Sequence, residues 1–97
     1  MVTHIVLFRL KDRSPESIQQ TAGILRSMDG RIPTLRAVEV AVDERHASNA
    51  FDIALRTTFA SWPDYDAYRI HPYHQDPVLA HMHAAAETAA VVDFESE

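Results

Sequence analysis

The chain has 97 residues, of which 46% are hydrophobic and 24% are charged, and this size and composition fit one globular domain over residues 1–97. The 9 lysines and arginines stand against 14 aspartates and glutamates. The resulting formal net charge of −5 argues against binding nucleic acid or anionic membranes through bulk electrostatics. The absence of cysteine excludes disulfides, thiolate nucleophiles and iron–sulfur or thiolate-zinc sites. No apolar run is long enough to span a bilayer, and we expect the protein in the cytoplasm.

The first half of the chain predicts two strands with a helix between them. Residues 2–10 are typical of a strand that carries apolar side chains on both faces. Ser14 as N-cap and Pro15 at the first helical position predict a helix over residues 15–29. Residues 36–42 place valine at every second position, which predicts a strand with one apolar face.

The second half again predicts a strand, a helical region and a strand, but its helical region is broken in two. A strand is expected over residues 51–59 and a helix over residues 62–70. Pro72 disfavours helical geometry at the residue before it, so the helix should break there. The Asp-Pro pair at 76–77 predicts the start of a second helical piece, and a last strand is expected over residues 89–95.

The element order β-α-β-β-α-β predicts an α+β, ferredoxin-like fold whose four-stranded antiparallel sheet is covered by helices on one face. The bare face would carry apolar side chains of the first and last strands, namely Ile5, Leu7, Val92 and Phe94. A contiguous apolar patch of this kind is rarely left exposed. We therefore predict a homodimer through the open sheet face, closed into a dimeric α/β barrel. The alternative is a monomer with a hydrophobic sheet face.

Several stretches resemble the stress-responsive dimeric α/β-barrel (Dabb) family. They are the opening strand at 4–11, the segments 52–55 and 58–61, and above all residues 68–74, which read Tyr-x-x-His-Pro-x-His. The resemblance covers nearly the whole chain and implies the ferredoxin-like fold and the dimeric barrel. It does not by itself imply an enzyme, because most members of this family have no assigned activity.

One branch of that family, the plant polyketide cyclases, closes a linear polyketide by intramolecular aldol condensation without a metal or an organic cofactor. Similarity to this branch implies that Tyr68 and His74 carry the chemistry and that His4 lines the same pocket. The chain departs from the branch at two pocket positions, where Leu25 replaces a tyrosine and Ile53 replaces a histidine.

The residues themselves favour a related chemistry. A neutral imidazole can remove a proton from a carbon next to a carbonyl, so His74 is the candidate catalytic base, and a phenol such as Tyr68 can hold the enolate oxygen. An apolar pocket between sheet and helices is expected, with these ligand-binding residues: His4, Phe8, Leu25, Val38, Ile53, Leu55 and His71. The structural alternative is that the histidines of the helix break satisfy backbone groups and that Tyr68 is a core aromatic.

Cofactors are not expected. His4, His71 and His74 could supply three imidazoles to a metal, but Pro72 breaks the helix that would align the last two. The two glycines cannot form a phosphate cradle.

Two hypotheses for function follow. The first is a homodimeric barrel protein, related to stress responses, that binds a small apolar molecule. The second is a cofactor-free cyclase or lyase that acts on a polyketide-like carbonyl compound, with His74 as general base.

Overall fold

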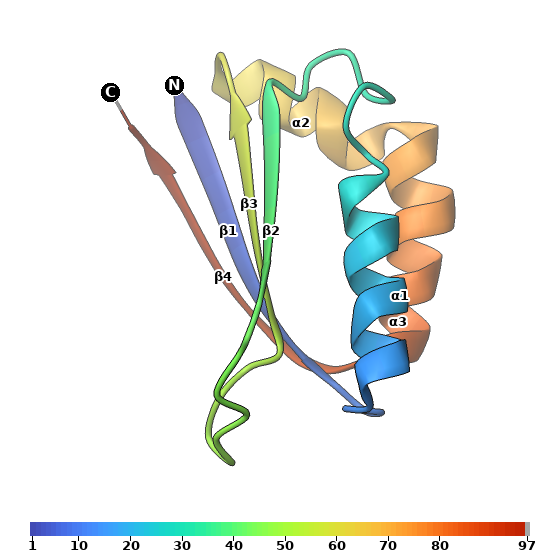
Figure 1. Cartoon of the computed structure of the whole chain (residues 1–97). Coiled ribbons are helices and arrows are strands. Elements are labelled where there is room, and N and C mark those ends of the chain that lie inside the picture. The colour runs from blue at the N-terminus through green and yellow to red at the C-terminus, as the bar shows by residue number, and fades with distance from the viewer. Residues whose placement is uncertain (97) are drawn as a thin grey trace.

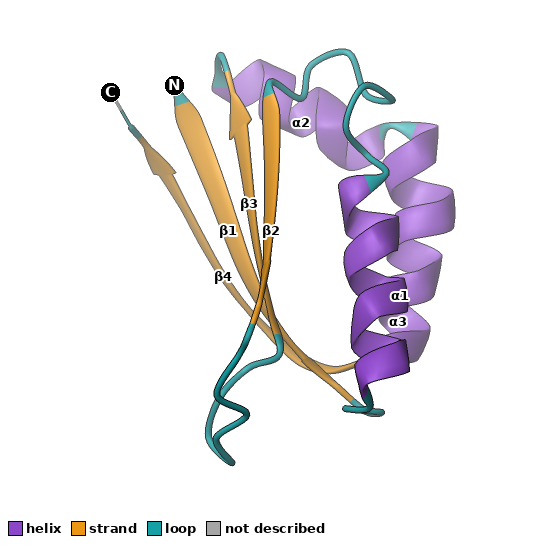
Figure 2. Ribbon diagram, viewed as in Figure 1, coloured by secondary structure: helices purple, strands orange, loops and turns teal. Residues whose placement is uncertain are grey.

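The computed structural model describes residues 1–96, and its four strands form one antiparallel sheet in the order β2-β3-β1-β4 (Figure 1). The elements along the chain are β1 (Val2–Leu10), α1 (Pro15–Arg26), β2 (Ala37–Val42), β3 (Ile53–Phe59), α2 (Trp62–Ile70), the π-helix η1 (His74–Leu79), α3 (Ala80–Ala85) and β4 (Ala86–Glu95). All helices lie on one side of the sheet (Figure 2). The predicted ferredoxin-like fold is therefore confirmed. Over residues 1–96, no helix combines the length and apolar character that crossing a membrane requires.

The core lies between the sheet and α1. Ile18, Ala22 and Leu25 recur at helical spacing along α1, and all three are buried. They pack against the covered face of the sheet, in one cluster with Leu55 and Phe59 of β3. Burial of this stripe is the main favourable contribution to docking the helix.

The uncovered face of the sheet is apolar at its β1–β4 side. The register pairs Ile5 with Val92 and Leu7 with Ala90, and directly paired residues share a face. Phe94 lies two residues beyond Val92 and so faces the same way. Leu7, Phe94 and Val92 are 37%, 40% and 56% exposed in the single chain. The predicted apolar open face is thus present.

Helix α1 begins as predicted and ends early. The Ser14 hydroxyl accepts a hydrogen bond from the backbone N–H three residues on, at 3.2 Å. The helix stops at Arg26, whereas the prediction extended it to residue 29. The N–H groups of Met28 and Asp29 bond to carbonyls three residues back, so the chain tightens into turns there. Gly30 follows with a φ of +78°, which suits a residue without Cβ.

The helical region after β3 breaks where predicted but restarts differently. His71 is extended, with φ −65° and ψ 137°, as Pro72 requires. The expectation that Asp76 and Pro77 begin a new helix is wrong, because both lie inside η1. Proline lacks the N–H of an α-helical ladder and crowds the carbonyl four residues back, and the wider π turn accommodates this. The helix consequently runs on from η1 into α3 without interruption.

Three strands differ from their predicted starts. β2 begins at Ala37 and not at residue 36. β4 begins at Ala86 and not at residue 89, because Ala86 pairs with Leu10 across a register shift in the β1–β4 ladder. β3 begins at Ile53 and not at residue 51. The preceding Asp52 is buried, and its side chain turns back towards the end of β1.

Asp52 ties the end of β1 to the start of β3. One carboxylate oxygen accepts from the backbone N–H of Leu10 at 2.8 Å, and the other accepts from Arg13 Nε at 2.9 Å. The side chain is only 1% exposed, so water cannot replace these donors. The carboxylate therefore fixes how the chain leaves β1 and enters β3.

We predict that Asp52→Ala lowers the free energy of unfolding by about 2 kcal/mol, because it leaves the Leu10 N–H without an acceptor and removes a charge-assisted bond. Urea unfolding followed by circular dichroism measures the change. Glu44→Ala, in an exposed loop, is the matched control and should cost less than about 0.5 kcal/mol. Equal effects of the two substitutions would contradict this role of Asp52.

Candidate functional site

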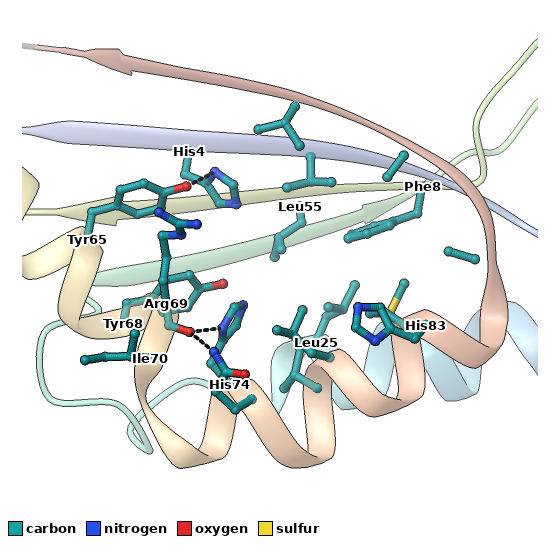
Figure 3. A pocket seen from close by; sticks show the side chains of 18 of the residues that line it. His4, Phe8, Leu25, Leu55, Tyr65, Tyr68, Arg69, Ile70, His74 and His83 are labelled. Atoms are coloured by element: carbon teal, nitrogen blue, oxygen red, sulfur yellow. Dashed lines mark hydrogen bonds between the residues drawn. The ribbon is translucent and has the colours of Figure 1, made fainter.

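A cavity of about 600 Å³ lies between the covered face of the sheet and the helical segment formed by α2, η1 and α3 (Figure 3). Most of the labelled polar side chains gather at one end of it, whereas Phe8, Leu25 and His83 lie towards the other (Figure 3). The labelled polar residues at the first end are His4, Tyr65, Tyr68, Arg69 and His74. A volume of this size, mostly apolar with a few converging polar groups, is typical of a small-molecule site.

Small residues on β4 help to leave this space open. The register places Ala89 opposite Phe8 and Val91 opposite Val6, and Ala86 begins the strand. All three β4 side chains line the cavity, and two of them are alanines that fill little volume. The cavity therefore lies over the β1–β4 side of the sheet.

His74 occupies the first position of η1, and its ring edge faces the cavity (Figure 3). Its Nδ1 donates to the carbonyl of Arg69 at 3.0 Å. This bond fixes the tautomer of the neutral ring, so the lone pair is on Nε2. Burial lowers the pKa of His74 and outweighs the opposite effect of that hydrogen bond, so the ring is neutral near pH 7. A neutral imidazole with a free Nε2 lone pair can act as a base.

The bond to Arg69 also bears on the structural alternative for His74. The ring does satisfy a carbonyl left open at the helix break, as that alternative expected. The same carbonyl, however, accepts a second hydrogen bond from Gln75 Nε2 at 2.6 Å. Loss of the imidazole would therefore not leave the Arg69 carbonyl without a donor.

Tyr68 lies directly beside His74, with ring centroids 4.3 Å apart. The residue is 1% exposed, and burial raises the pKa of its phenol, so the hydroxyl keeps its proton. That hydroxyl donates to the sulfur of Met28 at 3.8 Å, and thioether sulfur is a weak acceptor. Tyr68 is thus both a core aromatic, packed 4.9 Å from the ring of Phe59, and a donor that a better acceptor could recruit.

His4 extends from β1 at the same end of the cavity and belongs to a hydrogen-bonded group of three. Its Nδ1 donates to Asp93 Oδ1, which the register places directly opposite on β4. The Tyr65 hydroxyl donates to Asp93 Oδ2 at 3.2 Å and lies 3.2 Å from His4 Nδ1 (Figure 3). Neither Asp93 nor Tyr65 was among the residues predicted from sequence. The pairing of the first and last strands could have indicated Asp93. The position of Tyr65 one helical turn before Tyr68 could have indicated Tyr65.

The structure brings together six of the residues predicted for the site: Tyr68, His74, His4, Phe8, Leu25 and Leu55 all line the cavity. Val38 and Ile53 do not. Val38 lies on the edge strand β2, and Ile53 starts β3 at the far end of its pairing with β1. α1 packs over this part of the sheet.

His71 lies outside the cavity lining as well. Its Nδ1 accepts a hydrogen bond from the backbone N–H of Tyr73 at 3.1 Å, so the ring is used at the helix break. The three imidazoles considered for a metal do not converge. Among the side chains of residues 1–96, no group of three or more histidines and carboxylates is placed to hold a metal ion.

Residues 2–96 match the family described as Stress responsive A/B Barrel Domain, Dabb. The chain belongs to this family. Among solved structures, a dimeric ferredoxin-like protein of unknown function from Bacteroides fragilis is 27% identical, with a TM-score of 0.82, covering 98% of this chain and 95% of that one. A dimeric ferredoxin-like protein of unknown function from Thermobifida fusca is 26% identical, with a TM-score of 0.82 and coverages of 96% and 88%.

A hydroxynitrile lyase from Passiflora edulis shares the fold of this Dabb protein at 23% identity, with a TM-score of 0.75 and coverages of 96% and 90%. At that level of identity the likeness shows the fold alone. No curated protein matches the chain. The family and the fold are thus established, whereas any activity depends on the residues that line the cavity.

The lowered pKa of His74 predicts how stability depends on pH. In the unfolded chain an imidazole has a pKa near ~6.5, above that of His74 in the folded protein, so protonation of this ring favours unfolding. Above about pH 6.5 the ring is neutral in both states, and its contribution to stability is complete. It is lost as the pH falls from there through the lower folded-state pKa. Wild type should lose stability more steeply than His74→Asn below about pH 6.5, by at most ~1.4 kcal/mol per pH unit.

Asparagine suits this comparison because its side-chain amide can still donate to the Arg69 carbonyl but does not titrate. Urea unfolding at a series of pH values between about 8 and 5 gives both slopes. Parallel slopes for wild type and His74→Asn would show that the ring is not held neutral by the fold.

Proposed function

We propose that the cavity binds a small organic molecule with an apolar body and a carbonyl end, and that His74 removes a proton from the carbon next to that carbonyl. The observation that carries this proposal is the bond from His74 Nδ1 to the Arg69 carbonyl at 3.0 Å. It leaves Nε2 of a neutral ring directed into a mostly apolar cavity. A general base needs this combination of a free lone pair and a pKa near or below the working pH.

The lining supports the orientation of the ligand. Most of the lining is aliphatic or aromatic, with Phe8 from the sheet, Leu25 from α1, and Val78 and Met82 from the helical segment. Such walls favour an alkyl or aryl group through burial of apolar surface. Its carbonyl would then lie at the polar end, beside His74 and Tyr68.

The reaction needs no cofactor. His74 Nε2 takes the proton, the electron pair of the broken C–H bond moves to form the enolate, and the negative charge collects on the carbonyl oxygen. The Tyr68 hydroxyl, whose present acceptor is only the Met28 sulfur, can donate to that oxygen. In a substrate with a second carbonyl group, the enolate carbon can attack that carbonyl carbon and close a ring, which is the cyclase form of this chemistry.

The second candidate is a binding protein without catalysis, and the same apolar cavity supports it. The hydroxynitrile lyase from Passiflora edulis carries its activity on a similar fold, but its 23% identity lends no chemistry to this chain. The two candidates differ in one measurable respect, namely whether the bound molecule exchanges its carbon-bound protons.

We also infer that the protein forms a homodimer through the open sheet face. Val92, Phe94 and Leu7 leave an apolar surface on a face that the helices do not cover. Two relatives above 25% identity are described as dimeric. Two such faces packed against each other would remove this surface from water and form the α/β barrel for which the family is named.

To test the proton transfer, we predict that the protein accelerates deuterium uptake by 4-phenylbutan-2-one, a ketone with an aryl tail, at the carbons beside its carbonyl. Proton NMR in D2O follows the loss of those signals. His74→Asn should reduce the protein-dependent rate by about 100-fold or more, because the base is gone. The ketone should still bind to this variant, as chemical-shift titration of the protein would show.

His46→Asn is the matched control, since His46 lies in an exposed loop and its φ of +56° suits asparagine. This variant should retain the wild-type rate. Binding of the ketone without any acceleration would favour the non-catalytic candidate, and an unchanged rate in His74→Asn would exclude His74 as the base.

To test the dimer, we predict that Val92→Asp shifts the protein to monomers, because a buried carboxylate without a partner is strongly unfavourable in an apolar interface. Native mass spectrometry gives the mass of the assembly. Ala47→Asp, in an exposed loop, should remain dimeric. A monomeric wild type, or a dimer that tolerates Val92→Asp, would contradict the proposed interface.

A further inference from the structure

Three imidazoles line the cavity, those of His4, His74 and His83, and the proposed function uses only His74 and leaves His4 without a role. His4 is nearly buried, yet it lines the cavity and is held by Asp93 and Tyr65. Both its ring and that of His74 lie near the ring of Tyr68, with centroid distances of 6.3 and 4.3 Å. One histidine comes from the sheet and the other from the helical segment (Figure 3).

We propose that His4 is a second catalytic residue, which gives a proton to the carbonyl oxygen of the substrate while His74 takes one from carbon, and that Asp93 and Tyr65 position it for this task. The inference rests on the proposed function and extends it to an acid–base pair that acts from opposite walls of one cavity. The substrate class it implies is an enolisable ketone or related carbonyl compound.

The bond to Asp93 decides which nitrogen of His4 is available. Because Nδ1–H donates to the carboxylate, Nε2 is the nitrogen that remains, and it lies on the edge of the ring that faces the cavity (Figure 3). A protonated His4 therefore presents Nε2–H to a bound molecule. Asp93 acts on this ring as the aspartate of a catalytic triad acts on its histidine, by fixing the orientation and stabilising the cation.

Tyr65 completes the support of Asp93. Its hydroxyl donates to the second carboxylate oxygen, and burial together with the charge of Asp93 raises the pKa of Tyr65 to about 12. The phenol therefore remains a donor throughout the neutral range. Both carboxylate oxygens are thus engaged, one by His4 and the other by Tyr65.

The two histidines differ in what stands next to them. The neighbour of His4 is the carboxylate of Asp93, which accepts the Nδ1 hydrogen. His74 instead donates to a backbone carbonyl, and burial is the main cause that lowers its pKa. The hydrogen-bond partners therefore assign His4, which is held by a carboxylate, as the acid and His74 as the base. The titratable groups around His4 are Asp93 from β4, Tyr65, Asp66, Tyr68 and Arg69 from α2, and His74 from η1.

The step balances without any further reactant. The C–H bond breaks, its proton goes to His74 Nε2, and its electron pair becomes the carbon–carbon double bond of an enol. The π electrons of the carbonyl take the proton of His4 Nε2–H, so that bond breaks and an O–H bond forms. The positive charge passes from His4 to His74, and reversal of the step restores both rings.

The first test is independent of turnover. Protein with ¹⁵N-labelled histidine rings shows by NMR which ring nitrogens carry protons, and single histidine variants assign the signals. We expect His4 to keep its proton on Nδ1 when neutral, and to take up a second proton at higher pH than His74 does. Asp93→Asn should delay that uptake to lower pH. A neutral His4 with its proton on Nε2, or protonation of His74 first, would overturn the proposal.

The second test uses 4-phenylbutan-2-one in D2O. His4→Gln and Asp93→Asn should each slow deuterium uptake about 10-fold or more. The decline in rate towards high pH should be abolished in His4→Gln, because the acid is lost, and moved to lower pH in Asp93→Asn, because the acid has lost its carboxylate partner. His46→Asn should change neither. Wild-type rates and pH profiles in both variants, with uptake still lost in His74→Asn, would overturn the role of His4 and leave the proposed function intact. No uptake in the wild type would overturn both.

Discussion

The pairing of β1 with β4 is the constraint on which the site depends. Because directly opposed residues in an antiparallel pair share a face, this register brings Asp93 to His4 and Ala89 to Phe8 on the covered side. The first pair creates the charged and hydrogen-bonded end of the cavity, and the second leaves space for its apolar end. A slip by one residue would turn these side chains to the opposite face and remove both features.

The helix break supplies the other wall. Pro72 forces His71 out of helical geometry, and the chain then re-enters a helix through a π turn that contains Pro77. The Arg69 carbonyl left open by this break accepts from His74 and Gln75, which anchors the imidazole with Nε2 free. The same local irregularity thus satisfies a backbone group and presents a candidate base, so a structural and a chemical role for His74 are compatible.

Much of the fold could be predicted from the sequence because its signals are local: period-two valines, the Ser14 cap and the proline at 72 each act over a few residues. The site depended on features that are not local. Val38 and Ile53 were expected in the pocket, but α1 packs over their part of the sheet. Asp93 was missed because its partnership with His4 spans 89 positions and follows only from the strand register. The π turn at Pro77 escaped prediction because proline is equally typical of a helix start.

The proposed function requires that a ketone lies in the cavity with its carbonyl at the His74 end and its apolar body at the other. Intermolecular NOEs between isotope-labelled protein and 4-phenylbutan-2-one measure this orientation directly. We expect contacts from the methyl and methylene groups beside the carbonyl to the rings of His74 and Tyr68, and from the phenyl group to Phe8 and Met82. A phenyl group placed against His74, or a ketone bound outside the cavity, would contradict the proposed function.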